Sequence, residues 1–209
     1  MRELPMFPLG SVLLPHMVLP LHIFEPRYRT MIRRVLDGDG EFGVVLITRG
    51  HEVGGGEQRA DLGAVARVLQ AQELDDGRWL CVAVGTRRLR VVEWLPDDPH
   101  PRAVVEELED PPGRPADAPA VARVQSRLRR VLALQAELDE PSVPSTTELA
   151  DDPVAASWQA GILAPLGPLD ALALLEVDAA GDRLALLEDA LEDAAEALQF
   201  RLGGGAGPG

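Results

Sequence analysis

Two histidines and a carboxylate lie close together near the start of the chain. His16, His22 and Glu25 carry the kinds of side chain that bind zinc or act as general bases. A pair of ligands on one strand is two residues apart, and a pair on one helix is three or four apart. His16 and His22 are six residues apart with Pro20 between them, and no third strong ligand stands near. We therefore expect strand histidines here and no metal site.

Cys81 is the only cysteine, which rules out an internal disulfide and a zinc site of several cysteines. A nucleophilic cysteine needs a lowered pKa and a neighbouring base, usually at a loop or a helix N-terminus. Cys81 instead lies inside the apolar run WLCVAVG, so we expect it to be a small core residue.

The glycine-rich stretch 50–56 (GHEVGGG) could hold a phosphate if it joined a strand to a helix N-terminus. A strand-like run follows it instead, and we expect a flexible loop between strands. The chain contains no lysine, since all 20 basic residues are arginine. These residues therefore supply no P-loop lysine, no Schiff base and no Ser-Lys protease dyad.

Arg87, Arg88 and Arg90 stand on one strand-like run, where Arg88 and Arg90 could meet an anionic ligand. The acidic character of the chain favours a solvated strand face instead. No serine stands in the nucleophile-elbow context of Ser-His-Asp catalysis. We therefore expect neither catalytic residues nor a cofactor, and we predict that the protein is not an enzyme.

The 209 residues are 46% hydrophobic and 26% charged, which is typical of a globular protein that buries a core. The formal net charge of -14 repels nucleic acid and anionic membranes. No apolar stretch reaches the roughly 20 residues that span a bilayer. Glu3 and the prolines after it do not fit a signal peptide. We expect a cytoplasmic protein without a nucleic acid or membrane partner.

The first half of the chain contains short strand-like runs and one early helix. Proline at the first position and an apolar face at three- and four-residue steps predict a helix over Pro26–Leu36. Asp75-Asp76-Gly77 predicts a hairpin turn, and Gly85-Thr86 separates two strand-like runs. The predicted strands are Leu4–Leu9, Val18–Phe24, Phe42–Thr48, Gly63–Leu74, Arg78–Gly85, Arg87–Leu95 and Ala103–Leu108.

The second half follows a proline-rich boundary at residues 110–120 and has helical periodicity. The predicted helices are Ala118–Leu138, Pro153–Leu163, Leu169–Leu175 and Asp182–Leu202. We divide the chain into a β-domain at 1–110, a helical subdomain at 118–202 and a disordered, glycine-rich tail at 203–209. The expected fold class is α+β, with a small barrel or sandwich in the first half.

Several short phrases follow one another in a fixed order: LPMFPL at 4–9, LPHMVLPL at 14–21, GAVARV at 63–68 and GTRRLRV at 85–91. This ordered set resembles the N-terminal domain of Lon proteases. HIFEPRYR at 22–29 is similar to the stand-alone branch of that family. In the helical half, Asp152-Pro153, LLE at 174–176 and Arg183-Leu184 also resemble it, so the resemblance extends to about residue 202.

The resemblance implies a PUA-like β-barrel or pseudo-barrel with one early helix, followed by a helical subdomain. In Lon this region helps to recognise and hold substrate proteins and contributes to hexamer assembly, while the ATPase and peptidase domains come later. The catalytic residues of Lon have no matching positions here. The role is carried over by analogy, because one fold can host many functions.

We therefore expect a non-catalytic module that binds unfolded proteins or exposed segments, as an adaptor for a separate protease or a chaperone-like holder. Phe24, Tyr28 and Met31 are the candidate peptide-binding residues. Helical spacing by itself favours the alternative that they pack the early helix onto the β-domain.

Other functions stay open at this point. One is an RNA-binding PUA-like domain, which the net charge disfavours; another is a small-molecule enzyme with a cryptic site. A weak homo-oligomer could form through the apolar face of Ala118–Leu138. The last helix is a poorer surface for close packing, because Glu188, Glu192 and Glu196 make one of its faces acidic.

Overall fold

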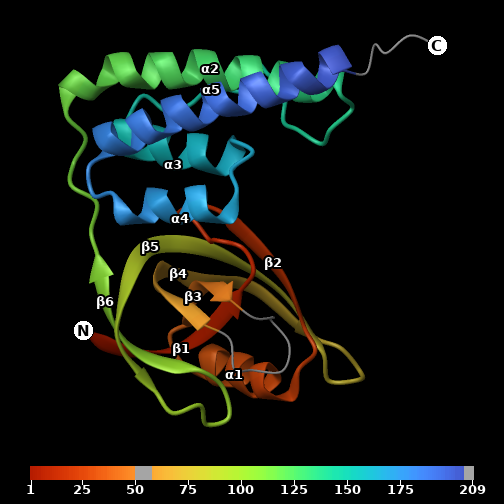
Figure 1. The fold of residues 1–209 in the computed structure, drawn as a ribbon. Helices are drawn as coiled ribbons and strands as arrows, with labels where there is room; N and C mark the ends of the chain where they lie inside the picture. The colour runs from red at the N-terminus through yellow and green to blue at the C-terminus, as the bar shows by residue number, and fades with distance from the viewer. Residues whose placement is uncertain (50–57, 205–209) are drawn as a thin grey trace. The chain divides into compact units, whose positions relative to one another are not determined.

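The computed structural model describes residues 1–49 and 58–204, so the stretch 50–56 and the last five residues lie outside the described part. The chain divides into two compact units, Met1–Glu109 and Asp110–Gly209. A sheet and one helix make up the first unit and helices the second, which confirms the α+β class (Figure 1). In the described ranges no helix is long and apolar enough to cross a membrane.

The first unit contains seven of the regular elements. Its strands and helix are β1 Arg2–Leu9, β2 Val18–Ile23, α1 Pro26–Asp37, β3 Glu41–Arg49, β4 Gln58–Glu73, β5 Trp79–Leu95 and β6 Arg102–Leu108. The elements of the second unit are the 3-10 helix Pro115–Asp117, α2 Ala118–Glu137, α3 Pro153–Leu163, α4 Pro168–Glu176 and α5 Ala180–Gly204. The predicted tail therefore begins inside α5, which continues through Gly204.

The strands of the first unit close into a ring. Their order is β2-β5-β4-β3-β1-β6, and β5 pairs with β6 as well. β1 and β3 are parallel, and the other neighbours are antiparallel. The long strand β5 closes the ring, because its first half pairs with β2 and its second half with β6. β2 is thus an additional strand outside the ring, held by β5 (Figure 1).

The predicted break at Gly85-Thr86 is wrong, because β5 runs without interruption from Trp79 to Leu95. A Cβ at Gly85 would overlap the carbonyl group of Leu14. The Gly85 N–H donates to the Met17 carbonyl at 2.9 Å. Glycine is needed here because two backbones approach closely, and not because the chain turns.

The hairpin between β4 and β5 confirms the turn predicted at Asp75-Asp76-Gly77. Gly77 has a φ of 78°, a left-handed conformation that glycine adopts at little cost. The Arg78 N–H donates to the Asp76 carboxylate at 3.1 Å, which holds the turn.

α1 packs its apolar face into the main core of the first unit. Pro26 begins the helix after an extended Glu25, as predicted, and the helix ends one residue later than expected, at Asp37. Its buried side chains are Tyr28, Met31, Ile32 and Val35. They share one cluster with strand residues that include Phe7 and Phe42.

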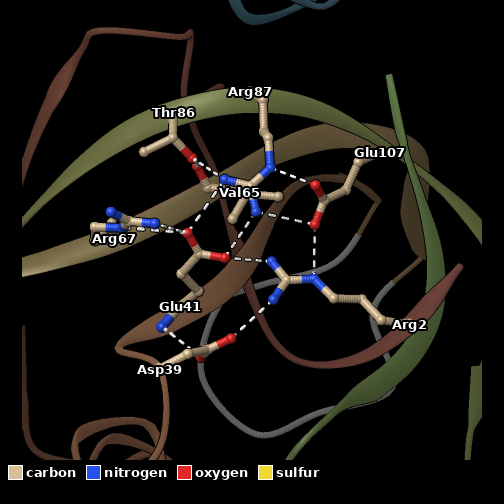
Figure 2. A network of polar contacts seen from close by, with 8 residues as sticks. All are labelled: Arg2, Asp39, Glu41, Val65, Arg67, Thr86, Arg87 and Glu107. Atoms are coloured by element: carbon tan, nitrogen blue, oxygen red, sulfur yellow. Dashed lines mark hydrogen bonds and ion pairs between the residues drawn. The ribbon is translucent and has the colours of Figure 1, made fainter. Parts of the chain in front are cut away.

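A network of charged side chains joins strands of the ring (Figure 2). The Glu41 carboxylate of β3 is 3% exposed and accepts hydrogen bonds from Arg67 of β4 (2.7 Å) and Arg87 of β5 (2.8 Å), and from Arg2 of β1. Glu107 of β6 pairs with Arg2 at 2.6 Å and with Arg87. Each of β1, β3, β4, β5 and β6 therefore contributes one residue to the network.

The electrostatics of the network favour its charged form. Burial of the Glu41 carboxylate opposes ionisation, but hydrogen bonds from Arg87, Arg67 and Arg2 outweigh burial and lower its pKa to about 2. Hydrogen bonding from Arg87 likewise lowers the pKa of Glu107. Hydrogen bonds to Glu107 and Glu41 raise the pKa of Arg87. The network is therefore fully ionised near neutral pH.

The prediction that the arginines of β5 form a solvated face is wrong for Arg87 and Arg88. Arg87 belongs to the network, and Arg88 is 1% exposed with its Nη2 3.5 Å from the Glu109 carbonyl oxygen. Glu41 and Glu107 engage the Arg87 guanidinium, and Arg88 is buried, so neither side chain forms an open, solvated face. Arg90 keeps the exposed position that was predicted, 3.9 Å from Glu106.

The second unit is built around α2 and α5. Both helices bury an apolar face, and α3 packs on each of them. The buried side chains include Val124, Leu128, Val131 and Leu132 of α2 and Leu184, Leu187, Leu191 and Leu198 of α5. The face of α2 proposed for self-association is therefore used inside the unit.

Within the unit, arginines of α2 neutralise part of the acidic face of α5. Arg123 pairs with Glu188 at 2.8 Å. Arg127 and Arg130 both pair with Glu192, the second at 3.1 Å.

Arg183 of α5 is fully buried, 4.0 Å above the Trp158 ring and 3.1 Å from Asp110.

The substitution Glu41→Gln should destabilise the protein by about 2–3 kcal/mol at pH 7, because three arginines lose their shared counter-charge. The pKa of Glu41 is lower in the folded state than its ordinary value of 4.5. Its contribution is therefore complete above about pH 4.5 and declines as the pH falls towards 2. Urea unfolding followed by circular dichroism at pH 7 and pH 3 measures both effects.

The matched control is Glu106→Gln on β6, whose exposed carboxylate lies 3.9 Å from Arg90. It should leave the unfolding midpoint unchanged. A Glu41→Gln variant as stable as the wild type at pH 7 would contradict this role of the network.

Candidate functional site at the edge strand β2

An apolar hollow of about 290 Å³ lies beside β2, where the strand meets the end of β1 and the start of α1. We call it the inner hollow. Its lining residues are Phe7, Pro8, Leu9, Ser11, Leu19, Pro20, Leu21, His22, Ile23, Phe24, Glu25 and Tyr28. Phe24 and Glu25 connect β2 to α1, and both residues line the hollow.

The three predicted peptide-binding residues have different surroundings. Phe24 is 52% exposed at the inner hollow, and its ring centroid lies 6.2 Å from that of His22. Tyr28 is nearly buried and packs on Phe7, with 4.3 Å between the ring centroids. Met31 is fully buried in the core and offers no surface to a peptide. The structure thus brings Phe24 and Tyr28 together at the hollow and leaves Met31 out.

Glu25, which lines the inner hollow, is paired with its neighbour Arg27. The Arg27 Nε donates to the Glu25 carboxylate at 3.1 Å, and the Arg27 guanidinium lies 4.5 Å from the centre of the Tyr28 ring. The pair neutralises both charges and covers one side of the aromatic ring. The hollow is therefore suited to an apolar group and not to an ion.

A second, larger hollow of about 700 Å³ also borders β2, and we call it the outer hollow. Its lining residues are Pro20, Leu21, His22, Gln70, Ala71, Gln72, Leu80, Cys81 and Val82, from β2, β4 and β5. Leu80 is 46% exposed there, and Val18 at the start of β2 is 56% exposed. Exposed aliphatic side chains thus accompany β2 along its length.

His16 and His22 do not assemble a metal site. In the parts of the chain that the structure describes, no group of three histidine, cysteine or acidic residues could hold an ion. The His16 N–H donates to the Gly85 carbonyl at 2.7 Å from a loop position with a φ of 68°. His22 stands on the exposed face of β2.

Cys81 is a buried core residue, as the sequence predicted. Burial raises the pKa of the Cys81 thiol to about 11, because the thiolate would lie among apolar groups. The thiol therefore stays protonated at neutral pH, which disfavours nucleophilic attack by Cys81.

The family described as the ATP-dependent protease La (LON) substrate-binding domain matches residues 3–193. The chain belongs to this family. A LON peptidase N-terminal domain and RING finger protein from Schizosaccharomyces pombe is 24% identical over 229 residues, which are 96% of this chain and 47% of the relative. Lon protease 2 from Herpetosiphon aurantiacus is 26% identical over 205 residues, which are 95% of this chain and 24% of the relative.

The solved structures agree with this assignment. The Lon N-terminal domain protein from Xanthomonas campestris has 29% sequence identity and a TM-score of 0.66, and the match covers 90% of this chain and 97% of that chain. The chain therefore matches nearly all of a Lon N-terminal domain, while it spans about half or a quarter of the curated relatives.

The sequence singled out Phe24, which lines the inner hollow, but did not reveal either hollow of this Lon-family chain. The side chains of Gln72 and Leu80, which line the outer hollow, come from parts of the sequence distant from β2, and no local pattern links them to it. One signal was present in VLPLHI. Leu19 and Leu21 pack on the core while Val18, Pro20 and His22 are exposed, which is the alternation of a strand with one open face.

Native Cys81 should react with a maleimide at pH 8 at least a hundredfold more slowly than the guanidinium-unfolded chain, because its raised pKa and its burial both suppress thiolate attack. The rate is measured by mass spectrometry of quenched samples. Labelling of the native protein as fast as the unfolded chain would show that Cys81 is accessible and reactive.

Proposed function

We propose that this chain is a non-catalytic protein-binding domain that holds exposed apolar segments of other proteins at the inner hollow. One observation carries the proposal: Phe24 is half exposed at an apolar hollow whose aromatic floor is Tyr28 and Phe7. The family description, a substrate-binding domain of an ATP-dependent protease, supports the same role.

Physical chemistry favours an apolar partner at this place. Covering an exposed aromatic ring with apolar groups contributes on the order of 1–2 kcal/mol. Rigid aromatic anchors are also the residues that carry most of the binding energy in protein interfaces. Unfolded chains expose apolar side chains that a folded protein buries, so they are the partners that this surface would select.

The proposed role is to hold a client protein or to deliver it to a separate protease. The chain has no lysine for an ATP-binding P-loop or a Ser-Lys dyad, so hydrolysis would have to come from another domain or protein. Binding through apolar contacts depends little on ionic strength, unlike attraction between charged surfaces.

RNA binding has less support. Arg2, Arg67 and Arg87 are engaged by carboxylates in the network, and Arg123 and Arg127 pair with glutamates of α5. The net charge of -14 also opposes a phosphate backbone.

The variant Phe24→Ala should weaken binding of an unfolded protein about tenfold, because the inner hollow loses its exposed aromatic anchor. The probe is fluorescein-labelled, permanently unfolded carboxymethylated α-lactalbumin, and fluorescence anisotropy gives the dissociation constant. Native α-lactalbumin should not bind.

The control variant is Phe200→Ala, which removes an 82% exposed phenylalanine from α5 and should leave binding unchanged. Equal weakening by both substitutions would point to unspecific adhesion. Failure of the wild-type protein to bind the unfolded probe at high micromolar concentration would refute the proposed function.

A further inference from the structure

β2 has a free edge. It pairs with β5 from Val18↔Val84 to Ile23↔Trp79, and it stands at the end of the strand order, with no strand on its other side among residues 1–49 and 58–204. Figure 1 shows β2 in this position beside β5. An edge strand presents a row of main-chain donors and acceptors to which an extended chain can add.

The register shows which residues face outward. The Gly85 N–H donates to the Met17 carbonyl, so the hydrogen bond lies one residue beyond the opposed pair Val18 and Val84. Val18 and Val84 are therefore a non-hydrogen-bonded pair of the antiparallel ladder. Because the two kinds of pair alternate, Leu19, Leu21 and Ile23 direct their main-chain groups to β5. Val18, Pro20 and His22 direct theirs to the open edge.

Pro20 fits this assignment, because proline lacks an N–H and is tolerated where the strand makes no ladder bond through that group. The open edge therefore offers the N–H groups of Val18 and His22 and the carbonyl groups of Val18, Pro20 and His22. An added strand could therefore donate to all three of these carbonyl groups, but it would lack one donor on β2, the N–H that Pro20 does not have.

The surfaces on the two sides of this edge are apolar. Pro20, Leu21 and His22 line both the inner and the outer hollow. Leu80 of the outer hollow stands opposite His22 on the exposed face, whereas Tyr28 of the inner hollow belongs to the core on which Leu21 packs, so the hollows lie on different faces of the sheet. Side chains of an extended segment point alternately to opposite faces. A segment added to β2 would therefore direct one set of side chains towards Phe24 and the other towards Leu80.

We propose that an extended apolar segment of a client protein binds by adding as a strand to the open edge of β2, with alternate side chains directed to the two hollows. This inference rests on the proposed function and specifies its binding mode. Main-chain hydrogen bonds make recognition tolerant of sequence, and the hollows select apolar side chains. The missing donor at Pro20 disfavours long, regular strands, which would leave a carbonyl group unpaired there.

The test on the protein compares His22→Pro with His22→Ala. Both variants lose the imidazole, but only proline removes the outward N–H. We expect His22→Pro to bind carboxymethylated α-lactalbumin about tenfold more weakly than His22→Ala, with circular dichroism spectra and thermal midpoints alike. Equal affinities would overturn the inference.

The test on the ligand uses the wild-type protein, so it does not depend on the folding of a variant. The probe is a fluorescein-labelled peptide of alternating valine and threonine, with two analogues N-methylated on alternate residues. One analogue should lose at least tenfold in affinity and the other less than threefold, because only one edge of the peptide faces β2. Equal affinity of both analogues with the unmethylated peptide would overturn strand addition.

The outcomes separate this inference from the proposed function. If wild-type protein binds neither probe, both fail. If it binds unfolded lactalbumin while the histidine variants match each other and the methylated analogues bind like the parent, only strand addition fails. A wild-type dimer in analytical sedimentation that His22→Pro dissociates would show that a second copy occupies the edge, and would overturn the client as its occupant.

Discussion

The buried carboxylate of Glu41 is the constraint on which the first unit depends. A carboxylate that is 3% exposed would be costly if it stood alone, and here it accepts hydrogen bonds from arginines of three other strands. Glu107 links two of these arginines to β6. Ion pairs thus join strands that are far apart in the sequence where the ring closes. The same contacts lower the pKa of Glu41.

Ring closure explains why the candidate site lies at β2. The strands of the ring have partners on both edges, so their main-chain groups are used inside the sheet. β2 is added to β5 outside the ring and keeps one edge open, with apolar hollows on both sides of it. Leu19 and Leu21 of β2 pack on the core, in which Tyr28 and Phe7 are in contact. A surface of this kind suits the family's description as a substrate-binding domain.

Local signals predicted the elements that local chemistry controls. Pro26 after an extended Glu25 marked the start of α1, Asp76-Gly77 marked the hairpin, and Pro153 marked the start of α3. Gly85 and Arg88 were misread for one reason. A glycine in a turn and a glycine under a crossing backbone look alike in sequence, and so do a solvated and a buried arginine. Of the three residues predicted to bind a peptide, Phe24 is exposed, whereas Met31 is in the core.

The sequence by itself determined the α+β class, the family, the acidic charge and the absence of lysine chemistry, because these follow from composition, periodicity and the order of short phrases. Only the tertiary structure decided which polar groups are buried, which face of α2 is used, and that β2 has an open edge between two hollows. The physical reason is that burial and strand pairing are set by contacts between residues such as Leu14 and Gly85, or Glu41 and Arg87, whose separation along the chain leaves no local pattern.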